Sequence, residues 1–251
     1  MSFLTPTDWH DRFTRQSRWT AQVRRFLYDG LNLSQAERGL EVGCGTGVIA
    51  ADLAKFGSTQ MVGIDLRADF LDVARRQSPH LHLAKANALR LPFPSGSFDL
   101  TCCHYFLLWV SDPLAALKEM RRVTRPGAPV LAMAEPDYGG RIDFPPALVE
   151  IGQKQAVALR AQGAEPEIGR QLIDLFQSAG LHQSQAAVMG GQWGEQRSAE
   201  TNASEWAVLE ADLAGRVTTA ELDEYKKRDA LAWKNGLRIL YIPTFYAWGF
   251  A

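Results

Sequence analysis

Short apolar runs alternate with helical patterns between residues 38 and 135. Five runs are predicted to be strands because they are short, apolar and bounded by Gly, Asp, Asn or Pro: Gly39–Gly43, Gln60–Asp65, His80–Ala84, Phe98–Cys103 and Pro129–Glu135. Helical spacing separates them at Thr46–Phe56, at Arg67–Gln77 and after Asp112, the expected N-cap, with Pro113 as the first helical residue. This order predicts an open α/β sheet of parallel strands, with ligands beyond the strands' carboxyl ends.

The pattern is weaker outside this block. An N-terminal helix is expected within residues 6–29, and two helices separated near Gly215 are expected within residues 198–235. The remaining predictions are helices at Pro145–Ala161 and Glu167–Ala179, a strand at Gln183–Met189, and a β-rich segment at Arg238–Trp248. Pro243 cannot donate to a ladder, which favours an edge or a bulge at that position.

Composition and net charge limit the classes of protein to which this chain is expected to belong. The 251 residues are 46% hydrophobic and 22% charged, which fits one large globular domain or two small ones. A net charge of −1 gives no electrostatic reason to expect nucleic acid or a membrane surface as a partner. No apolar stretch approaches the roughly 20 residues that span a bilayer, and no signal-like segment begins the chain. Three cysteines form no disulfide framework, so we expect a cytoplasmic protein.

The most informative segment is Leu40–Gly47, which reads L-E-V-G-C-G-T-G between a strand and a helix. Its glycines permit a tight turn and a close ligand approach, and Asp65, 18 residues beyond Gly47, is placed to bind a ribose diol. Val48 stands where a dinucleotide site has its third glycine. Glu41 would repel a pyrophosphate and attract an ammonium group. These features favour a ligand with an amino-acid end and no phosphate.

These residues resemble the class I S-adenosylmethionine-dependent methyltransferases, in the branch that includes the ubiquinone/menaquinone-type enzymes. The resemblance covers about residues 38–135 and continues more loosely through 167–189. It implies a Rossmann-like, doubly wound, mostly parallel seven-stranded sheet with an antiparallel last strand and helical insertions. It also implies that Gln183–Met189 and Arg238–Trp248 join the sheet, with Pro243 at a bulge.

The resemblance further implies S-adenosyl-L-methionine as the cofactor and a role for each residue of its site. Glu41 would hold the methionine ammonium group, and the backbone of Gly43, Cys44 and Gly45 would lie against the methionine and ribose. Asp65 would bind the ribose hydroxyls, while Leu66 would pack on the adenine. The Asn87 amide oxygen and the Ala88 N–H would make the remaining contacts, both of them to the adenine.

The methyl acceptor is expected near the ends of the fourth and fifth strands. Methyl transfer is an in-line displacement, and a base helps only where the acceptor must lose a proton. His104 and Tyr105 are the candidates for a base or an orienting donor; alternatively, His104 lines the methionine end and Tyr105 caps the core. The acidic and polar residues after the fifth strand either bind a polar substrate or form a structural turn: Glu135, Asp137, Tyr138 and Arg141.

Aromatic residues outside the sheet either form a lid over the acceptor or belong to the core. They are Trp9, Phe13, Trp19, Phe144, Trp193, Trp206, Tyr225, Trp233, Phe245, Tyr246 and Trp248. The five histidines show no zinc-like spacing, so no metal site is predicted.

We therefore predict a single methyltransferase domain over residues 1–251 that acts on a small organic molecule. It comprises a helical cap (1–37), a cofactor-binding core (38–135), insertions that form a lid (136–166 and 192–236) and the C-terminal part of the sheet (167–191 and 237–251). Two alternatives remain: a non-catalytic protein that binds S-adenosylmethionine, and a nicotinamide-dependent oxidoreductase. The acceptor atom and the oligomeric state are left open.

Overall fold

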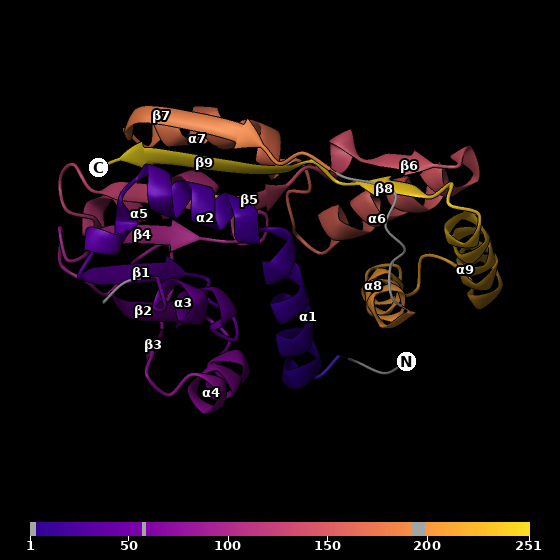
Figure 1. The fold of residues 1–251 in the computed structure, drawn as a ribbon, viewed down its shortest axis with the longest axis horizontal. Helices are drawn as coiled ribbons and strands as arrows, with labels where there is room; N and C mark the ends of the chain where they lie inside the picture. The colour runs from indigo at the N-terminus through magenta and orange to yellow at the C-terminus, as the bar shows by residue number, and fades with distance from the viewer. Residues whose placement is uncertain (1–3, 57–58, 192–198) are drawn as a thin grey trace.

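A seven-stranded sheet forms the centre of the molecule (Figure 1). The computed structural model describes residues 4–56, 59–191 and 199–251. The strands of this sheet are β1 (Arg38–Val42), β2 (Gln60–Asp65), β3 (His82–Lys85), β4 (Leu100–Cys103), β5 (Pro129–Pro136), β7 (His182–Val188) and β9 (Thr244–Phe250). Their order is β3-β2-β1-β4-β5-β9-β7, and β9 runs antiparallel to both of its neighbours. The predicted fold class is confirmed.

Helices cover both faces of this sheet. The helices of the structure are α1 (Pro6–Trp19), α2 (Ala21–Gly30), α3 (Val48–Leu53), α4 (Ala68–Gln77), α5 (Pro113–Val123), α6 (Val149–Ala161), α7 (Leu172–Ser178), α8 (Ala199–Asp212) and α9 (Thr219–Lys234). Side chains from α2 and α3 pack on one face, and side chains from α5 and α7 pack on the other. Because successive strand residues point to opposite faces, Leu40 and Val42 join the α5–α7 side while Glu41 points toward α3.

Helix α5 begins as its sequence predicts. The Asp112 carboxylate accepts a hydrogen bond from the Ala115 N–H at 2.8 Å, and Pro113 is the first helical residue. Four apolar side chains of the helix are then fully buried: Ala116, Leu117, Met120 and Val123. The cap therefore fixes where the helix starts, and its apolar stripe fixes which side packs on the sheet.

The N-terminal segment forms two helices rather than the single helix expected within residues 6–29. The chain breaks at Thr20, whose side chain is fully buried. Its hydroxyl lies 2.9 Å from His104 Nε2 and accepts a hydrogen bond from Arg24 Nη1 at 2.5 Å. These contacts fix the junction between α1 and α2 in the core of the molecule. Helix α2 lies on the sheet beyond it, whereas α1 stands between the sheet and the rest of the molecule (Figure 1).

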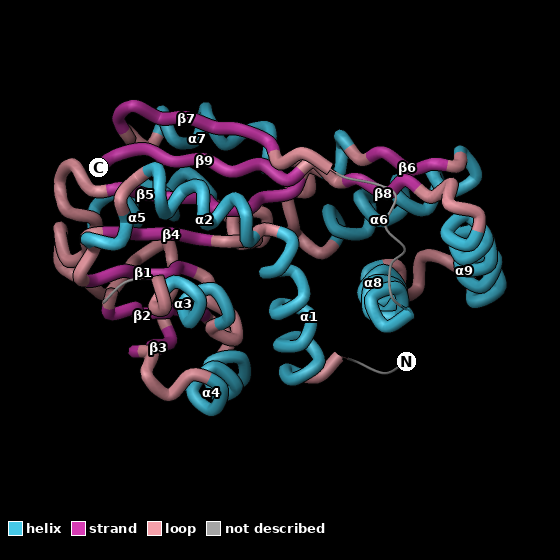
Figure 2. The backbone as a smooth tube through the Cα atoms, viewed as in Figure 1, coloured by secondary structure: helices cyan, strands magenta, loops and turns pink. Residues whose placement is uncertain are grey.

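A second, smaller unit lies beside the carboxyl ends of β4 and β5 (Figure 2). It contains a two-stranded antiparallel sheet of β6 (Ile142–Phe144) and β8 (Ile239–Tyr241), together with α6, α8 and α9. The predicted pair of helices on either side of Gly215 is confirmed in α8 and α9. The unit has its own buried cluster, formed by Leu148, Ile151, Ala158, Leu213, Tyr225 and Ala232. Residues inserted between strands of the main sheet thus build a separate small core.

The prediction that Arg238–Trp248 joins the main sheet is confirmed for Thr244–Trp248 only, and the bulge expected at Pro243 is wrong. Pro243 instead separates β8 from β9, and the two strands belong to different sheets. Proline has no N–H to donate, so the ladder ends there. Its carbonyl accepts from the Asp137 N–H at 2.7 Å, where the chain also leaves β5. Two of the crossings between the main sheet and the smaller unit, after β5 and before β9, are therefore tied together.

Candidate functional site

The turn after β1 is built from glycines in the left-handed region. Gly43, Gly45 and Gly47 have φ values of +71°, +52° and +78°. Between them, the Cys44 N–H donates to the Ile64 carbonyl at 2.9 Å, which ties the turn to β2. A side chain other than hydrogen at any of the three glycines would strain the backbone. The sequence pattern therefore identified the positions where this turn needs glycine.

Two aromatic rings lie directly on this glycine turn. A Cβ atom added to Gly43 would lie 2.2 Å from Phe106 Cδ2, and one added to Gly45 would lie 3.1 Å from Phe13 Cε2. Phe13 comes from α1 and Phe106 follows β4. The space that a Cβ atom would need at these two glycines is thus occupied by side chains of the chain itself. The sequence did not indicate these contacts.

Asp65 joins the glycine turn to the end of β2. Its Oδ2 accepts from the Gly45 N–H at 2.8 Å, and its Oδ1 accepts from the Arg67 N–H at 2.9 Å. Each carboxylate oxygen has a further lone pair for a ligand hydroxyl. The next residue, Leu66, leaves 60% of its surface exposed at the same edge of the sheet. A carboxylate followed by an exposed apolar side chain suits a ribose and its base.

Glu41 is a buried carboxyl group with an unsatisfied oxygen. The residue is only 2% exposed, and its Oε2 has no hydrogen-bond partner among the described residues. Burial raises the pKa of Glu41 to about 8, although a hydrogen bond from the Ala50 backbone acts in the opposite direction. A buried acceptor without a partner is costly, and an ammonium group or a water molecule would satisfy it.

The loop after β3 places Asn87 and Ala88 at the same edge as the glycine turn. Asn87 is exposed, and its side-chain oxygen accepts from the Leu89 N–H at 2.9 Å, which leaves one lone pair of that oxygen for a ligand. Ala88 is buried. Residues predicted from three different strands are therefore assembled at one edge, as parallel strands require.

His104 is held by the N-terminal helices rather than by the acceptor side of the site. Arg24 donates to Thr20 Oγ1, and the Thr20 hydroxyl lies closer to His104 Nε2 (2.9 Å) than to the Ser17 carbonyl (3.3 Å). The Thr20 hydroxyl and Nε2 share one hydrogen bond, and the tautomer of the ring sets which of them donates. Burial, assisted by the charge of Arg24, lowers the pKa of His104 to about 3. The imidazole is neutral and weakly basic.

Tyr105 faces a cavity of about 300 Å³. Its backbone is in the left-handed region (φ +50°), and its N–H donates to the Ala134 carbonyl at 2.8 Å. Burial raises the pKa of the Tyr105 phenol far above its ordinary value, so the hydroxyl keeps its proton. The two predicted catalytic residues thus separate: Tyr105 lines the cavity, whereas His104 is not among its lining residues.

The cavity lies between α1, the ends of β4 and β5, and the smaller unit. Three predicted lid aromatics line it, and they are Trp19, Trp206 and Trp233. Other predicted lid residues pack elsewhere: Tyr225 belongs to the small core, and Tyr246 and Trp248 pack with Phe26. Trp193 lies outside the described residues. The lid hypothesis and the core alternative each describe part of this aromatic set.

The two acids at the end of β5 and just after it are structural. Glu135 Oε1 accepts from the N–H groups of Phe106 and Leu107 at 2.9 and 3.0 Å, and Asp137 pairs with Arg170 at 2.5 Å. Burial raises the pKa of Glu135 to about 7. In contrast, Tyr138 and Arg141 line the cavity. Of the four residues considered for a polar substrate, the acids hold turns and the other two face the site.

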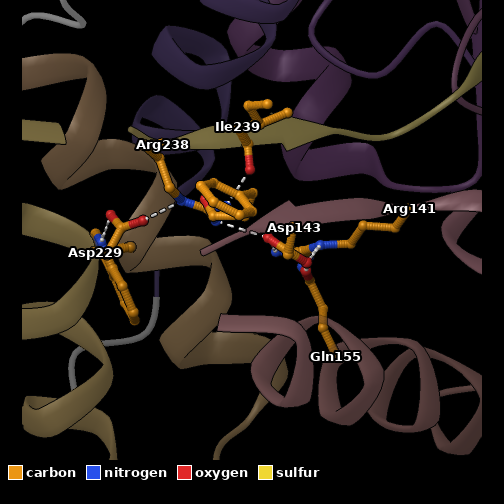
Figure 3. Close-up of polar contacts among 8 residues, drawn as sticks. Arg141, Asp143, Gln155, Asp229, Arg238 and Ile239 are labelled. Carbon is orange, nitrogen blue, oxygen red and sulfur yellow. Dashed lines mark hydrogen bonds and ion pairs between the residues drawn. The ribbon is translucent and has the colours of Figure 1, made fainter. Parts of the chain in front are cut away.

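A buried ionic network supports the cavity from the smaller unit (Figure 3). Arg238 donates to Asp229 at 2.6 Å and to Asp143 at 2.7 Å. Arg141 donates to the same Asp143 at 2.6 Å and to Gln155 at 2.5 Å. The sequence analysis did not find this network, because its members come from strands and helices up to 95 residues apart.

The N-terminal helix supplies further lining residues that the sequence analysis missed. Arg12 and Gln16, one turn apart on α1, both line the cavity. Arg12 pairs with Glu205 of α8 at 3.0 Å, and His10 Nδ1 lies 3.0 Å from the Thr46 hydroxyl of the glycine turn. Helix α1 therefore touches both the predicted cofactor loop and the wall of the cavity.

Within the described parts of the chain, no helix is long and apolar enough to cross a bilayer. Within residues 4–56, 59–191 and 199–251, no three His, Cys, Asp or Glu side chains cluster closely enough to hold a metal ion.

Comparison with known proteins agrees with this geometry. The family model described as a methyltransferase domain matches residues 40–132. A demethylmenaquinone methyltransferase of Beutenbergia cavernae is 40% identical over 104 residues, which are 41% of this chain and 43% of that protein. The chain thus spans about half the length of the curated relatives it matches.

Solved structures share the fold at low sequence identity. Phosphoethanolamine N-methyltransferase 2 of Haemonchus contortus, solved in complex with S-adenosyl-L-methionine, has a TM-score of 0.60 at 18% identity. That comparison covers 92% of this chain and 52% of the other. The YcgJ protein of Bacillus subtilis has a TM-score of 0.58 at 17% identity, over 92% of this chain and 98% of the other. Together with the glycine turn and its acids, these findings show that residues 40–132 match a methyltransferase domain and that the chain has the fold of known methyltransferases.

Proposed function

We propose that the protein transfers the methyl group of S-adenosyl-L-methionine to a small organic acceptor by in-line displacement. The observation that carries the proposal is the unsatisfied, buried Glu41 oxygen beside a glycine turn that Asp65 closes. A carboxylate there is suited to an ammonium group and unsuited to the pyrophosphate of a nicotinamide cofactor. The family match over residues 40–132 covers this part of the site.

Each residue of the proposed cofactor site has a distinct role. Glu41 would hold the methionine ammonium group, and the backbone of Gly43, Cys44 and Gly45 would lie against the methionine and the ribose. Asp65 would accept from the ribose hydroxyls with the lone pairs that its backbone contacts leave free. The adenine would lie on exposed Leu66, with Asn87 and Ala88 at its edge.

When bound, the cofactor supplies an electrophilic methyl group, and the chain's residues align the acceptor and exclude water. Tyr105 would orient the acceptor, because its phenol stays protonated and lines the cavity. His104 would act as a positioning residue that holds the α1–α2 junction through Thr20. Neither group can serve as a general base at neutral pH, because the Tyr105 phenol already carries its proton and the His104 imidazole is too weakly basic.

Calorimetric titration tests the cofactor assignment directly. We expect S-adenosyl-L-methionine to bind and NADH to give no heat, whereas the reverse would establish the oxidoreductase alternative. Release of S-adenosylhomocysteine with a panel of small acceptors then separates an enzyme from a non-catalytic binding protein. If the cofactor binds and no acceptor is methylated, the non-catalytic alternative is favoured.

The curated relatives named as demethylmenaquinone methyltransferases do not identify the acceptor of this chain. The family match ends at residue 132, whereas most of the cavity wall comes from α1 and from residues beyond 132. The acceptor must therefore be inferred from the cavity itself.

A further inference from the structure

Arg12 brings unused hydrogen-bond donors into the acceptor cavity. The residue is 9% exposed and lines the cavity from α1. Its Nη1 donates to Glu205 Oε1 at 3.0 Å, which is the only hydrogen bond of this guanidinium among the described residues. A guanidinium group has five N–H donors, so most of those on Arg12 have no acceptor in the protein. A buried, permanently charged group with free donors is suited to an anionic oxygen group.

Tyr138 adds a neutral donor to the same wall of the cavity. Tyr138 and Arg12 both line the cavity, and, besides burial, the charge of Asp212 raises the pKa of the phenol while that of Arg12 lowers it. Among the described contacts its hydroxyl has no hydrogen-bond partner, and burial raises its pKa to about 12, so the proton stays on oxygen at neutral pH. The arginine and the phenol therefore form a pair of donors without a matching acceptor.

The charges of the cavity wall disfavour a cationic acceptor. The ionisable lining residues other than tyrosine are three arginines and two carboxylates, Arg12, Arg141, Arg238, Glu205 and Asp229. Asp229 is already satisfied, because Oδ1 accepts from Arg238 at 2.6 Å and Oδ2 accepts from Trp206 Nε1 at 3.1 Å. The charge of Glu205 is balanced by its ion pair with Arg12. Asp143, which pairs with both Arg141 and Arg238, balances the third arginine, so an amine entering the cavity would meet carboxylates that already have cationic partners.

The remaining wall is suited to a flat apolar body. Trp19, Trp206 and Trp233 line the cavity together with aliphatic side chains such as Leu148 and Ile151. A volume of about 300 Å³ is at the small end of the range for ligand sites and accommodates a single ring.

We propose that Arg12 and Tyr138 form an anion-binding subsite and that the methyl acceptor is a small aromatic carboxylate. The proposal rests on the proposed function, because it assigns the acceptor side of that site. It makes Arg12 the residue that determines substrate class, through its charge and its unused donors.

Three single-ring probes test the subsite. Benzoate, benzamide and benzylamine share a ring and differ in charge, and their binding is measured by calorimetry and by the fluorescence of the cavity tryptophans. We expect benzoate to bind at least about tenfold more tightly than benzamide and benzylamine, as a charge-assisted hydrogen bond predicts. Arg12→Gln removes this preference, and Tyr138→Phe weakens benzoate binding by about three- to tenfold.

Glu205→Gln is the matched control. It breaks the same ion pair between α1 and α8 but leaves the charge of Arg12 in place, so benzoate binding is retained or tightened. If Glu205→Gln abolishes the preference as Arg12→Gln does, the effect comes from the helix contact and the subsite is rejected. Thermal melting of each variant excludes loss of folding as the cause.

Other outcomes also decide the matter. Equal affinity for benzoate and benzamide, a preference for benzylamine, or no benzoate binding at high millimolar concentration would each overturn the subsite. Cofactor binding is titrated separately on the same samples. A protein that binds S-adenosyl-L-methionine but shows no preference for benzoate keeps the proposed function and loses this inference. A protein that prefers benzoate but does not bind S-adenosyl-L-methionine keeps the anion subsite and loses both the proposed function and the assignment of a methyl acceptor.

Discussion

Glu41 is a buried carboxyl group that lowers the stability of the folded chain, and its proposed role is to bind the cofactor. The pKa of its carboxyl rises from 4.5 to about 8 in the folded chain, mainly because of burial. The folded state therefore binds more protons than the unfolded state between these pH values, so the free energy of unfolding falls as pH rises through this window. Glu135, with a pKa of about 7, changes stability in the same direction.

Glu41→Gln tests this trade-off. Above pH 8 the variant lacks the buried charge, so we expect a higher melting temperature than that of the wild type, by roughly 2–4 °C for each kcal/mol recovered. The same substitution removes the partner of the ammonium group and abolishes binding of S-adenosyl-L-methionine in calorimetry. Melting curves from pH 5 to pH 9 check the sign. A wild-type protein whose stability rises with pH across this range would contradict the assignment.

Glu135 is a second buried carboxyl group, and its role is structural. In Glu135→Ala the N–H groups of Phe106 and Leu107 lose their acceptor, and each such buried donor costs about 1–3 kcal/mol. We expect the variant to lose about 2–6 kcal/mol of unfolding free energy in urea. Glu135→Gln keeps an oxygen acceptor and should lose much less. Equal losses in the two variants would show that the charge, rather than the acceptor, is required.

At the scale of elements, the turn between β1 and α3 needs glycine for two separate reasons. Gly43 has a positive φ and also lies against the Phe106 ring. Gly127 has a similar φ of +79°, but no atom lies within 4 Å of an added Cβ. The pair therefore separates backbone strain from steric overlap.

We expect Gly127→Ala to cost only about 1–2 kcal/mol, the penalty for the left-handed backbone. Gly43→Ala has the same backbone penalty and also requires the Phe106 ring to move. That ring is restrained, because the Phe106 N–H donates to Glu135. It should unfold at a clearly lower urea concentration and lose cofactor binding. Equal midpoints for the two variants would argue that Phe106 moves aside freely.

The sequence predicted those elements whose signals are local. The cap at Asp112, the glycine turn and the paired helices around Gly215 depend on neighbouring residues, and the structure contains all three. The break at Thr20 was missed because a buried contact with His104, 84 residues away, fixes it. The split at Pro243 was missed because the proline shows where pairing stops but not which sheet each half joins.

The same distinction holds for the candidate site. Asp65 and the glycines follow their own strands directly, so the topology places them at one edge. Arg12, Tyr138 and Glu205 come from α1, the end of β5 and α8, and meet only through tertiary packing. The cofactor side was therefore predictable from motifs, whereas the acceptor side needed coordinates.

At the scale of the whole molecule, the buried network of Arg238 ties the smaller unit together. Arg238 pairs with Asp143 and Asp229, and all three side chains are at most 8% exposed. Removing one partner of a buried ion pair leaves an uncompensated charge, at a cost of about 3–5 kcal/mol.

Arg238→Met should therefore destabilise the smaller unit while the main sheet persists. We expect calorimetric melting to show an additional transition at lower temperature, with binding of S-adenosyl-L-methionine preserved. Arg228→Ala is the control, because the Arg228–Glu224 pair is about half exposed and is expected to contribute less than about 1 kcal/mol. A single, uniformly shifted transition in Arg238→Met would mean that the two units unfold together.

The position of β9 between β5 and β7 has a consequence for biosynthesis. A nascent chain on the ribosome has made β7 well before residues 244–250 emerge, yet β7 pairs only with β9 in the finished sheet. Until then β5 has one open edge, and such edges favour pairing with other chains. The sheet is therefore completed only after β9 has emerged, and the same strand carries the chain out of the wall of the cavity.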